Sequence, residues 1–226
     1  MKKIIAIVLV LACAFALFSC GEEDPTALTI SSINEMYNAT SPSRVDITST
    51  QTFGKYTLTS TSTLKTGMVD GFSVTVYEYS TQQLRDVESG AGADILDPIE
   101  TVTGSWAYHE DLGYRENDGE WDITGDDFTP ETGAIALNIT KDTAKDFKND
   151  SAAKTATFTV EAANTEAVFG IAIASDVAVT IVYSGADVTS VSLSYSITNP
   201  DEKDHPQVAV TVKADYSYDS QVITID

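Results

Sequence analysis

From Arg44 to the C-terminus, most of the chain alternates between apolar side chains and short polar ones. The clearest runs are Val45-Asp46-Ile47-Thr48, Tyr56-Thr57-Leu58-Thr59 and Phe72-Ser73-Val74-Thr75-Val76. Because successive side chains of a strand point to opposite faces, this period of two predicts antiparallel strands with one apolar and one wet face. The apolar face of such a sheet needs a cover.

Further strands are predicted along the rest of the chain by the same alternation. They are residues 101–109, 112–115, 120–123, 177–183, 188–198, 207–214 and 216–225. In the first of these, Val102, Gly104, Trp106 and Tyr108 share one face. Turn-forming residues separate several strands, and Asp-Gly is a strong signal for a two-residue hairpin. The expected turns are Asp118-Gly119, Ser184-Gly185, Asn199-Pro200-Asp201 and Asp215, and residues 81–98 are expected to form a loop.

Three short helices are predicted among the strands. Residues 28–39 place Ile30, Ile33 and Tyr37 on one helical face, and Ser32 with Glu35 fits a capping box. The second helix is predicted at 140–148, with Ala144 and Phe147 on a face, and the third at 164–174. The third segment could equally be a buried strand, because so short an apolar run does not decide between the two.

The N-terminus carries two lysines, a nearly unbroken apolar run from residue 4 to 18, and then Ser19-Cys20-Gly21. A helix of that run reaches about 22 Å, which is shorter than the ~30 Å hydrocarbon core of a bilayer. The pattern is therefore typical of a secretory signal peptide, predicted at residues 1–19.

Leu17-Phe18-Ser19-Cys20 resembles the lipobox of bacterial lipoproteins. The resemblance implies that Cys20 is acylated, that its lipid attaches the protein to the membrane, and that the domain lies outside the cytoplasm in the cell envelope. The alternative is an ordinary signal peptide with an incidental cysteine. Residues 20–27 are then the acylated cysteine and a flexible acidic tether, and 28–226 form a single β-rich domain.

Loss of the signal peptide removes Lys2 and Lys3. The mature chain then has 34 acidic and 11 basic residues, and its formal charge is −23. Such a surface repels nucleic acid, and we expect no nucleic-acid partner. With Cys13 removed and Cys20 acylated, no thiol is left for a disulfide, a metal or a nucleophile. The mature chain must be held together by its apolar core.

No catalytic pattern is present. The sequence has no Gly-x-Ser-x-Gly, and its two histidines, His109 and His205, lie far apart in acidic or charged segments. An EF-hand with its glycine at Gly119 fails at two ligand positions. Asp122, Asp126 and Asp127 near Glu120 fit a loose cation site less well than a solvated acidic rim. We therefore expect no enzyme, no metal site and no cofactor.

The order of elements resembles the LolA/LppX-like lipoprotein family: a helix, a run of strands, inserted helical segments, and a final strand block with Tyr216-Ser217-Tyr218 and Val222-Ile223-Thr224-Ile225. The resemblance is one of layout and covers nearly the whole mature chain. It implies an α+β, mainly antiparallel fold, an open curved half-barrel with a few short helices on the concave face. It also implies a lipid, acyl or lipoprotein ligand between sheet and helices. The alternative fold is a β-sandwich without a cavity.

Under this hypothesis, a hydrophobic cavity would be lined by apolar side chains of the strands and the third helix. The candidates are Trp106, Tyr108, Phe158, Phe169 and Ile173. Aromatic residues usually fill cores, so an ordinary core is the competing interpretation. The alternative functions are a glycan- or protein-binding surface module, suggested by the wet strand faces and Trp121, and a passive envelope component. We expect a monomer.

Overall fold

The computed structural model describes residues 25–54, 56–84, 99–109, 112–117, 120–125, 135–198 and 207–223. The helices are α2 (Pro25–Ala39), the 3-10 turn η1 (Ala162–Asn164) and α3 (Thr165–Phe169). The strands are β1 (Arg44–Phe53), β2 (Tyr56–Val69), β3 (Phe72–Leu84), β4 (Ile99–His109), β5 (Leu112–Asn117), β6 (Glu120–Gly125), β7 (Lys145–Asp150), β8 (Thr155–Val160), β9 (Val177–Ser184), β10 (Asp187–Thr198) and β11 (Gln207–Ser217).

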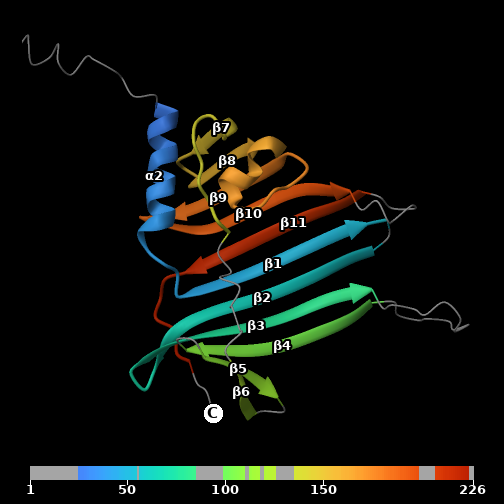
Figure 1. Ribbon diagram of the computed structural model, residues 1–226. Helices are drawn as coiled ribbons and strands as arrows, with labels where there is room; N and C mark the ends of the chain where they lie inside the picture. Colours follow the sequence, from blue (N-terminus) through green and yellow to red (C-terminus); the bar gives the residue numbers. More distant parts are fainter. Residues whose placement is uncertain are drawn as a thin grey trace, which may run out of the picture.

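All these strands belong to one open, curved antiparallel sheet. Its order is β6-β5-β4-β3-β2-β1-β11-β10-β9-β8-β7, so the first strand pairs with the last one and β6 and β7 form the two edges (Figure 1). The predicted fold class, an α+β protein with a curved sheet and a few short helices, is confirmed. The β-sandwich alternative is wrong, because the described strands form a single sheet.

Most strands lie where the alternation predicted them, and the Asp-Gly hairpin is confirmed by the pairing of Asn117 with Glu120. The predicted turn at Ser184-Gly185 is confirmed as well, and Gly185 has a positive φ of 63°. β3 extends to Leu84, into the predicted loop 81–98, and the remainder of that loop lies outside the described residues. The predicted turn at 199–201 also lies outside them.

The helix predicted at 28–39 exists but begins at Pro25, so residues 25–27 of the predicted tether are helical. Proline suits the first turn of a helix, because the amide proton it lacks has no partner there. The helix predicted at 140–148 is wrong. Thr140 and Ala144 form a turn, Asp146 takes a left-handed φ of 52° that ends helical geometry, and Lys145–Asp150 is the edge strand β7.

The helix predicted at 164–174 is only partly correct, since α3 ends at Gly170, whose φ is 72°. The predicted turn at Asp215 is wrong, because β11 continues through it to Ser217 while Asp46 lies opposite Asp215 in the register. The chain after Ser217 makes only one isolated bridge, between Gly67 and Gln221, so the strand predicted at 216–225 is wrong beyond Ser217 in the part described.

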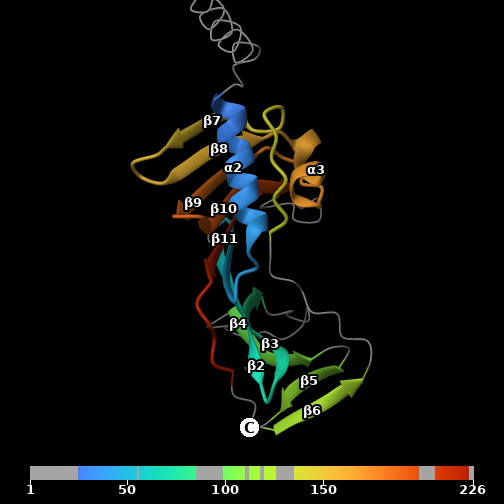
Figure 2. The same ribbon diagram turned by 90° about the vertical axis from the view of Figure 1, so that its left-hand side faces the viewer.

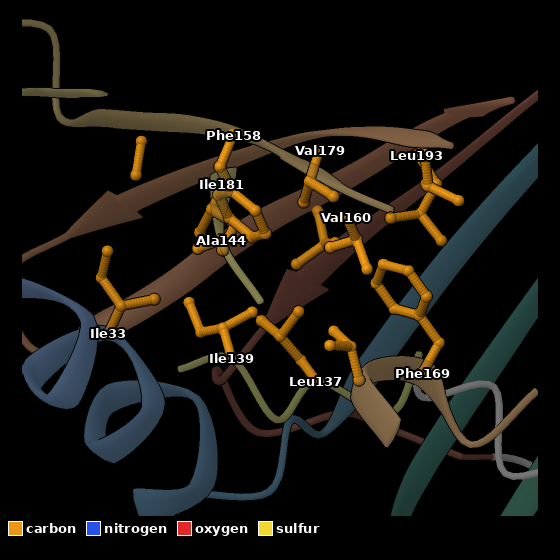
Figure 3. Close-up of a cluster of buried hydrophobic side chains, with 14 of the residues drawn as sticks. Ile33, Leu137, Ile139, Ala144, Phe158, Val160, Phe169, Val179, Ile181 and Leu193 are labelled. Carbon is orange, nitrogen blue, oxygen red and sulfur yellow. The ribbon is translucent and has the colours of Figure 1, made fainter. Parts of the chain in front are cut away.

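The main core lies between one half of the sheet and the segments that cover it. Figure 3 shows Ile33 of α2, Leu137 and Ile139 of the segment 135–144, and Phe169 of α3 pointing toward side chains of β8, β9 and β10. We call this covered side of the sheet the inner face. Both views place α2 and α3 over β7–β11, and no helix in the described part of the chain lies over β2–β4 (Figures 1 and 2).

Strand register aligns side chains into rows that cross the sheet. On the inner face, five directly opposed residues of β11, β1, β2, β3 and β4 form what we call the inner row. Its members are Tyr216, Val45, Leu64, Tyr77 and Trp106. On the opposite, outer face, directly opposed residues of the eight strands from β8 to β4 form the outer hydroxyl row. Its members are Thr157, Thr180, Ser192, Lys213, Thr48, Thr61, Ser80 and Thr103.

A second, smaller apolar cluster lies on the outer face of β3 and β4. Val74, Val76 and Ala107 are buried there, with Ile223 of the C-terminal segment packed against them. The C-terminal segment reaches this cluster by crossing Gly67 of β2. A Cβ at position 67 would lie 2.8 Å from the backbone oxygen of Gln221, which explains why glycine is needed there.

Candidate functional site

A cavity of about 200 Å³ lies where the C-terminal end of α2 meets β11. We call it the tyrosine pocket, because three tyrosines from α2, β11 and the segment after β11 form much of its wall. Its lining residues are Tyr37, Asn38, Thr40, Ser41, Pro42, Tyr216 and Tyr218. Tyr37 belongs to the apolar stripe of α2, and Tyr216 points to the inner face because it pairs with the core residue Val45.

Hydrogen bonds fix the three phenol groups of the pocket. The Tyr37 hydroxyl donates to the backbone oxygen of Ile135, so at the 3.0 Å contact between the two hydroxyl oxygens Tyr216 donates to Tyr37. Tyr218 donates to the backbone oxygen of Val188 at 2.8 Å. Each phenol proton is therefore bound to a protein oxygen, and each ring has a fixed orientation.

Burial raises the pKa of the Tyr37, Tyr216 and Tyr218 hydroxyls above the ordinary tyrosine value. All three are neutral at physiological pH. Among the described residues that line the pocket, none carries a carboxylate or an ammonium group. Its wall is therefore made of uncharged rings and short polar side chains, which suits an uncharged, largely apolar group.

The inner row leads from the pocket past the buried residue Val45 of β1 to β2–β4, the part of the sheet that no described helix covers. Tyr216 forms the pocket wall, and at the far end of the row Trp106 lies half-buried on β4. With strands about 4.8 Å apart, four inter-strand steps span roughly 19 Å. Val45 and Tyr216 are buried in the main core, and the side chains of the row that are only partly buried are those of Leu64, Tyr77 and Trp106 on β2–β4.

Two further tyrosine contacts shape the same surface. Tyr77 and Tyr79 of β3 stack with ring centroids 5.8 Å apart, and Tyr79 lies directly over its cross-strand partner Gly104. A Cβ at position 104 would be 2.6 Å from the Tyr79 ring. Gly104 therefore allows the ring of Tyr79 to lie flat against β4, which widens the aromatic surface beside the inner row.

The structure does not bring the five predicted cavity residues together. Phe158, Phe169 and Ile173 fill the main core, with exposed fractions of 4%, 4% and 6%. Trp106 and Tyr108 lie half-buried on β4, on the same inner face but in the other half of the sheet. Of the five, these last two lie on the part of the inner face that no described helix covers.

The tyrosine pocket was missed in the sequence. Its signal was present in two places: Tyr37 continues the apolar stripe of the helix, and Tyr216 and Tyr218 are two residues apart near the end of the last strand. What the sequence did not contain was the pairing between them, since Tyr37 and Tyr216 are 179 positions apart.

Several candidates for other chemistry fall outside the described residues, namely Cys20, His205, Asp126 and Asp127. In the part of the chain that the structure does describe, no three acidic, histidine or cysteine side chains lie close enough to hold a metal ion. No helix within these ranges has the length and apolar character to cross a membrane.

The chain has little similarity to known proteins. No protein-family model and no curated protein matches the chain. Among solved structures, it is similar to the crystal structure of LprF from Mycobacterium bovis, with 14% sequence identity, 91% of this chain and 98% of that chain covered, and a TM-score of 0.42. A likeness at this identity and TM-score does not assign the chain to a family.

Proposed function

We propose that this protein is an envelope lipoprotein that binds an acyl chain, of a lipid or of another lipoprotein, on the part of the inner face that no described helix covers. The observation that carries the proposal is the continuity between the tyrosine pocket and the inner row, which share Tyr216. Together they form an uncharged, apolar band rather than a set of reactive groups. We propose no enzymatic activity.

The size of the pocket favours a long ligand over a compact one. At about 200 Å³ it is smaller than the roughly 300–1,000 Å³ typical of small-molecule sites. A ligand that enters it must therefore extend onto the inner row. Each buried methylene group contributes about 0.8 kcal/mol, so affinity for this band grows with the length of the apolar chain.

The neutral wall of the pocket also determines which end of the ligand enters it. An anionic head group is unfavourable beside the buried phenol oxygens, and the strongly acidic chain adds long-range repulsion. We therefore place the apolar end of the ligand in the pocket and its polar end beyond Trp106, at the other end of the inner row.

The proposed anchor and the pocket lie at opposite ends of α2. Cys20 precedes Pro25 by five residues, whereas Tyr37 and Asn38 line the pocket at the C-terminal end of the helix. A 15-residue helix is about 22 Å long. The pocket thus lies about one helix length from the N-terminal end of α2, which suits a protein that holds an acyl chain outside the bilayer.

Titration with a pyrene-labelled fatty acid tests the binding site. The chain from residue 21 onward is secreted behind a cleavable signal, and the same chain carrying Leu64→Ser and Trp106→Ser is compared with it. The two substitutions interrupt the inner row, and we expect affinity to fall about tenfold or more, since each removes a large apolar side chain from the contact.

The matched control is Thr103→Ala, which changes the same strand, β4, on its outer face. It should leave the affinity unchanged. Equal affinity in the inner-row variant and the parent chain, or no binding by either, would refute the proposed site.

The anchor is tested separately in cells that express the full chain. Growth with an alkyne-labelled palmitate should label the protein, and Cys20→Ser should abolish the label and release the protein from the membrane fraction. Persistent labelling of the Cys20→Ser variant would show that the lipid is attached elsewhere.

A further inference from the structure

The outer face of the sheet carries regular rows of hydroxyl groups. The outer hydroxyl row crosses eight strands with seven threonine or serine side chains and Lys213. Beside it, a second row crosses six strands with five hydroxyls and one alanine. Its members are Thr159, Ala178, Ser194, Thr211, Thr50 and Thr59.

The two rows themselves are poor in charge although the protein is not. Protein surfaces are commonly about 25–35% charged, and this chain has 34 acidic and 13 basic residues. In the two rows the single charge is Lys213, whose ammonium lies 2.7 Å from a carboxylate oxygen of Asp215. Next to the rows on the same face, Lys65 pairs with Glu78 at 2.9 Å and Arg44 pairs with Asp46 at 2.7 Å. The rows are thus nearly neutral on a strongly acidic protein.

The outer face is also hollowed over β8–β11. A groove of about 560 Å³ lies there, and its lining includes Thr159, Ala178, Ser194, Ala209 and Thr211. One carboxylate, that of Asp176, also lines it and accepts a hydrogen bond from the Ala162 amide at 2.9 Å. Two of its lining residues, Ala178 and Ala209, have side chains shorter than those of the hydroxyl residues around them. Its volume falls within the roughly 300–1,000 Å³ range of ligand sites.

We propose that the outer face binds a neutral polysaccharide through its rows of hydroxyl groups, with a segment of the polymer seated in the groove over β8–β11. A hydroxyl both donates and accepts hydrogen bonds, so an array of hydroxyls matches a polymer that presents hydroxyls of its own. Threonine side chains have few rotamers, and the strands fix their spacing at about 4.8 Å. Binding therefore costs little side-chain conformational entropy.

The same features argue against other partners. A polyanion is repelled by the net charge of −21, and the two rows have no free cation to offset that repulsion. An apolar partner would bury hydroxyl groups without giving them hydrogen bonds. Because a single hydroxyl contact is weak, the binding depends on many contacts along one polymer. This inference concerns the face opposite the proposed acyl site and holds or fails independently of it.

A sedimentation assay tests the proposal with the full-length lipidated protein in a neutral detergent. The probes are three insoluble neutral polysaccharides: cross-linked dextran beads, starch granules and microcrystalline cellulose. The same dextran beads carrying sulfopropyl groups serve as the anionic counterpart. We expect the protein to sediment with at least one neutral probe, to keep that binding in added salt, and to bind the sulfopropyl beads less well.

The decisive variant is Thr48→Val with Thr61→Val, a directly opposed and exposed pair at the centre of the outer hydroxyl row. It removes two hydroxyls and keeps the β-branched shape, and we expect at least about fivefold weaker binding. The matched control is Thr66→Val with Thr75→Val, a directly opposed pair on the inner face of the same sheet whose hydroxyl oxygens lie 3.1 Å apart.

The control pair should bind as the parent protein does. Circular dichroism of both double variants confirms that the sheet is intact. No sedimentation with any of the three neutral probes, or equal binding by the Thr48→Val/Thr61→Val variant and the parent, overturns the proposal.

Discussion

The hydroxyl oxygens of Tyr37 and Tyr216 lie 3.0 Å apart, and their rings meet edge to face with centroids 5.7 Å apart. This contact joins the first described helix to the last strand of the sheet. It forms one wall of the tyrosine pocket, and its geometry is supported by the hydrogen bond from Tyr37 to Ile135. The shape of the proposed acyl site thus depends on elements from both ends of the domain.

Stability should fall steeply in alkaline solution because of these tyrosines. Burial raises the pKa of Tyr216 and Tyr37 above 10.0, so above pH 10 the unfolded chain loses these protons first. Their contribution is fully present below pH 10 and is lost as the pH rises, at up to about 1.4 kcal/mol per pH unit for each tyrosine. Urea unfolding of the Tyr216→Phe variant from pH 8 to 11 should show a shallower decline than the parent. Identical slopes would mean that Tyr216 ionises as freely in the folded state as in the unfolded one.

Thr165→Val should destabilise the protein by about 1–3 kcal/mol, because it removes the hydroxyl to which the backbone amide of Ile173 donates. The fully buried Thr165 hydroxyl accepts a hydrogen bond from the Ile173 amide at 2.8 Å and donates to the Ala162 oxygen at 3.0 Å. Thr165→Ser keeps the hydroxyl and loses only a methyl group. In chemical denaturation it should lose clearly less stability than Thr165→Val, and an equal loss would assign the effect to packing.

Gly104→Ala should displace the ring of Tyr79 and cost about 1–3 kcal/mol through overpacking. The reason is the 2.6 Å approach between a Cβ at position 104 and that ring. A double-mutant cycle checks it: in a Tyr79→Ala background, Gly104→Ala should cost much less. If the two effects simply add, the ring and the glycine are not coupled.

Gly67→Ala should release the C-terminal segment from the outer face. The new Cβ would lie 2.8 Å from the backbone oxygen of Gln221 and 3.1 Å from the side chain of Ile223, and backbone cannot give way as a flexible side chain does. Limited proteolysis followed by mass measurement should find cleavage near residue 221 in this variant and not in the parent. Ile223→Ala, which weakens the same contact without a clash, should show an intermediate rate of cleavage.

The strands could be predicted from the sequence because their alternation is a local property. In β9–β11 most apolar residues that the pattern assigns to one face are buried in the core, as Val179, Ile181 and Val191 show, whereas Ile197 on the same face is exposed and the strand β8 was not predicted. The same pattern gave the Asp118-Gly119 hairpin. Sequence alone also predicted the helix that covers the sheet, since Ile30 and Ile33 are nearly fully buried.

The wrong predictions from the sequence have local and long-range causes. Asp146 adopts a left-handed backbone that its residue type does not require, so the apolar spacing of Ala144 and Phe147 suggested a helix where a turn and an edge strand exist. The pocket and the rows depend on strand register, which aligns Tyr216 with Val45 across 171 positions of sequence. No local pattern specifies such a pairing, and for that reason the predicted cavity mixed core residues such as Phe158 with surface ones such as Trp106.

The native mass of the protein tests the central claim most directly. The chain from residue 21 onward, secreted by lipid-containing cells and purified under mild conditions, should carry the added mass of an acyl-bearing ligand, and the Leu64→Ser/Trp106→Ser variant should lose it. A folded parent chain whose mass equals that of its sequence would contradict acyl binding on the inner face.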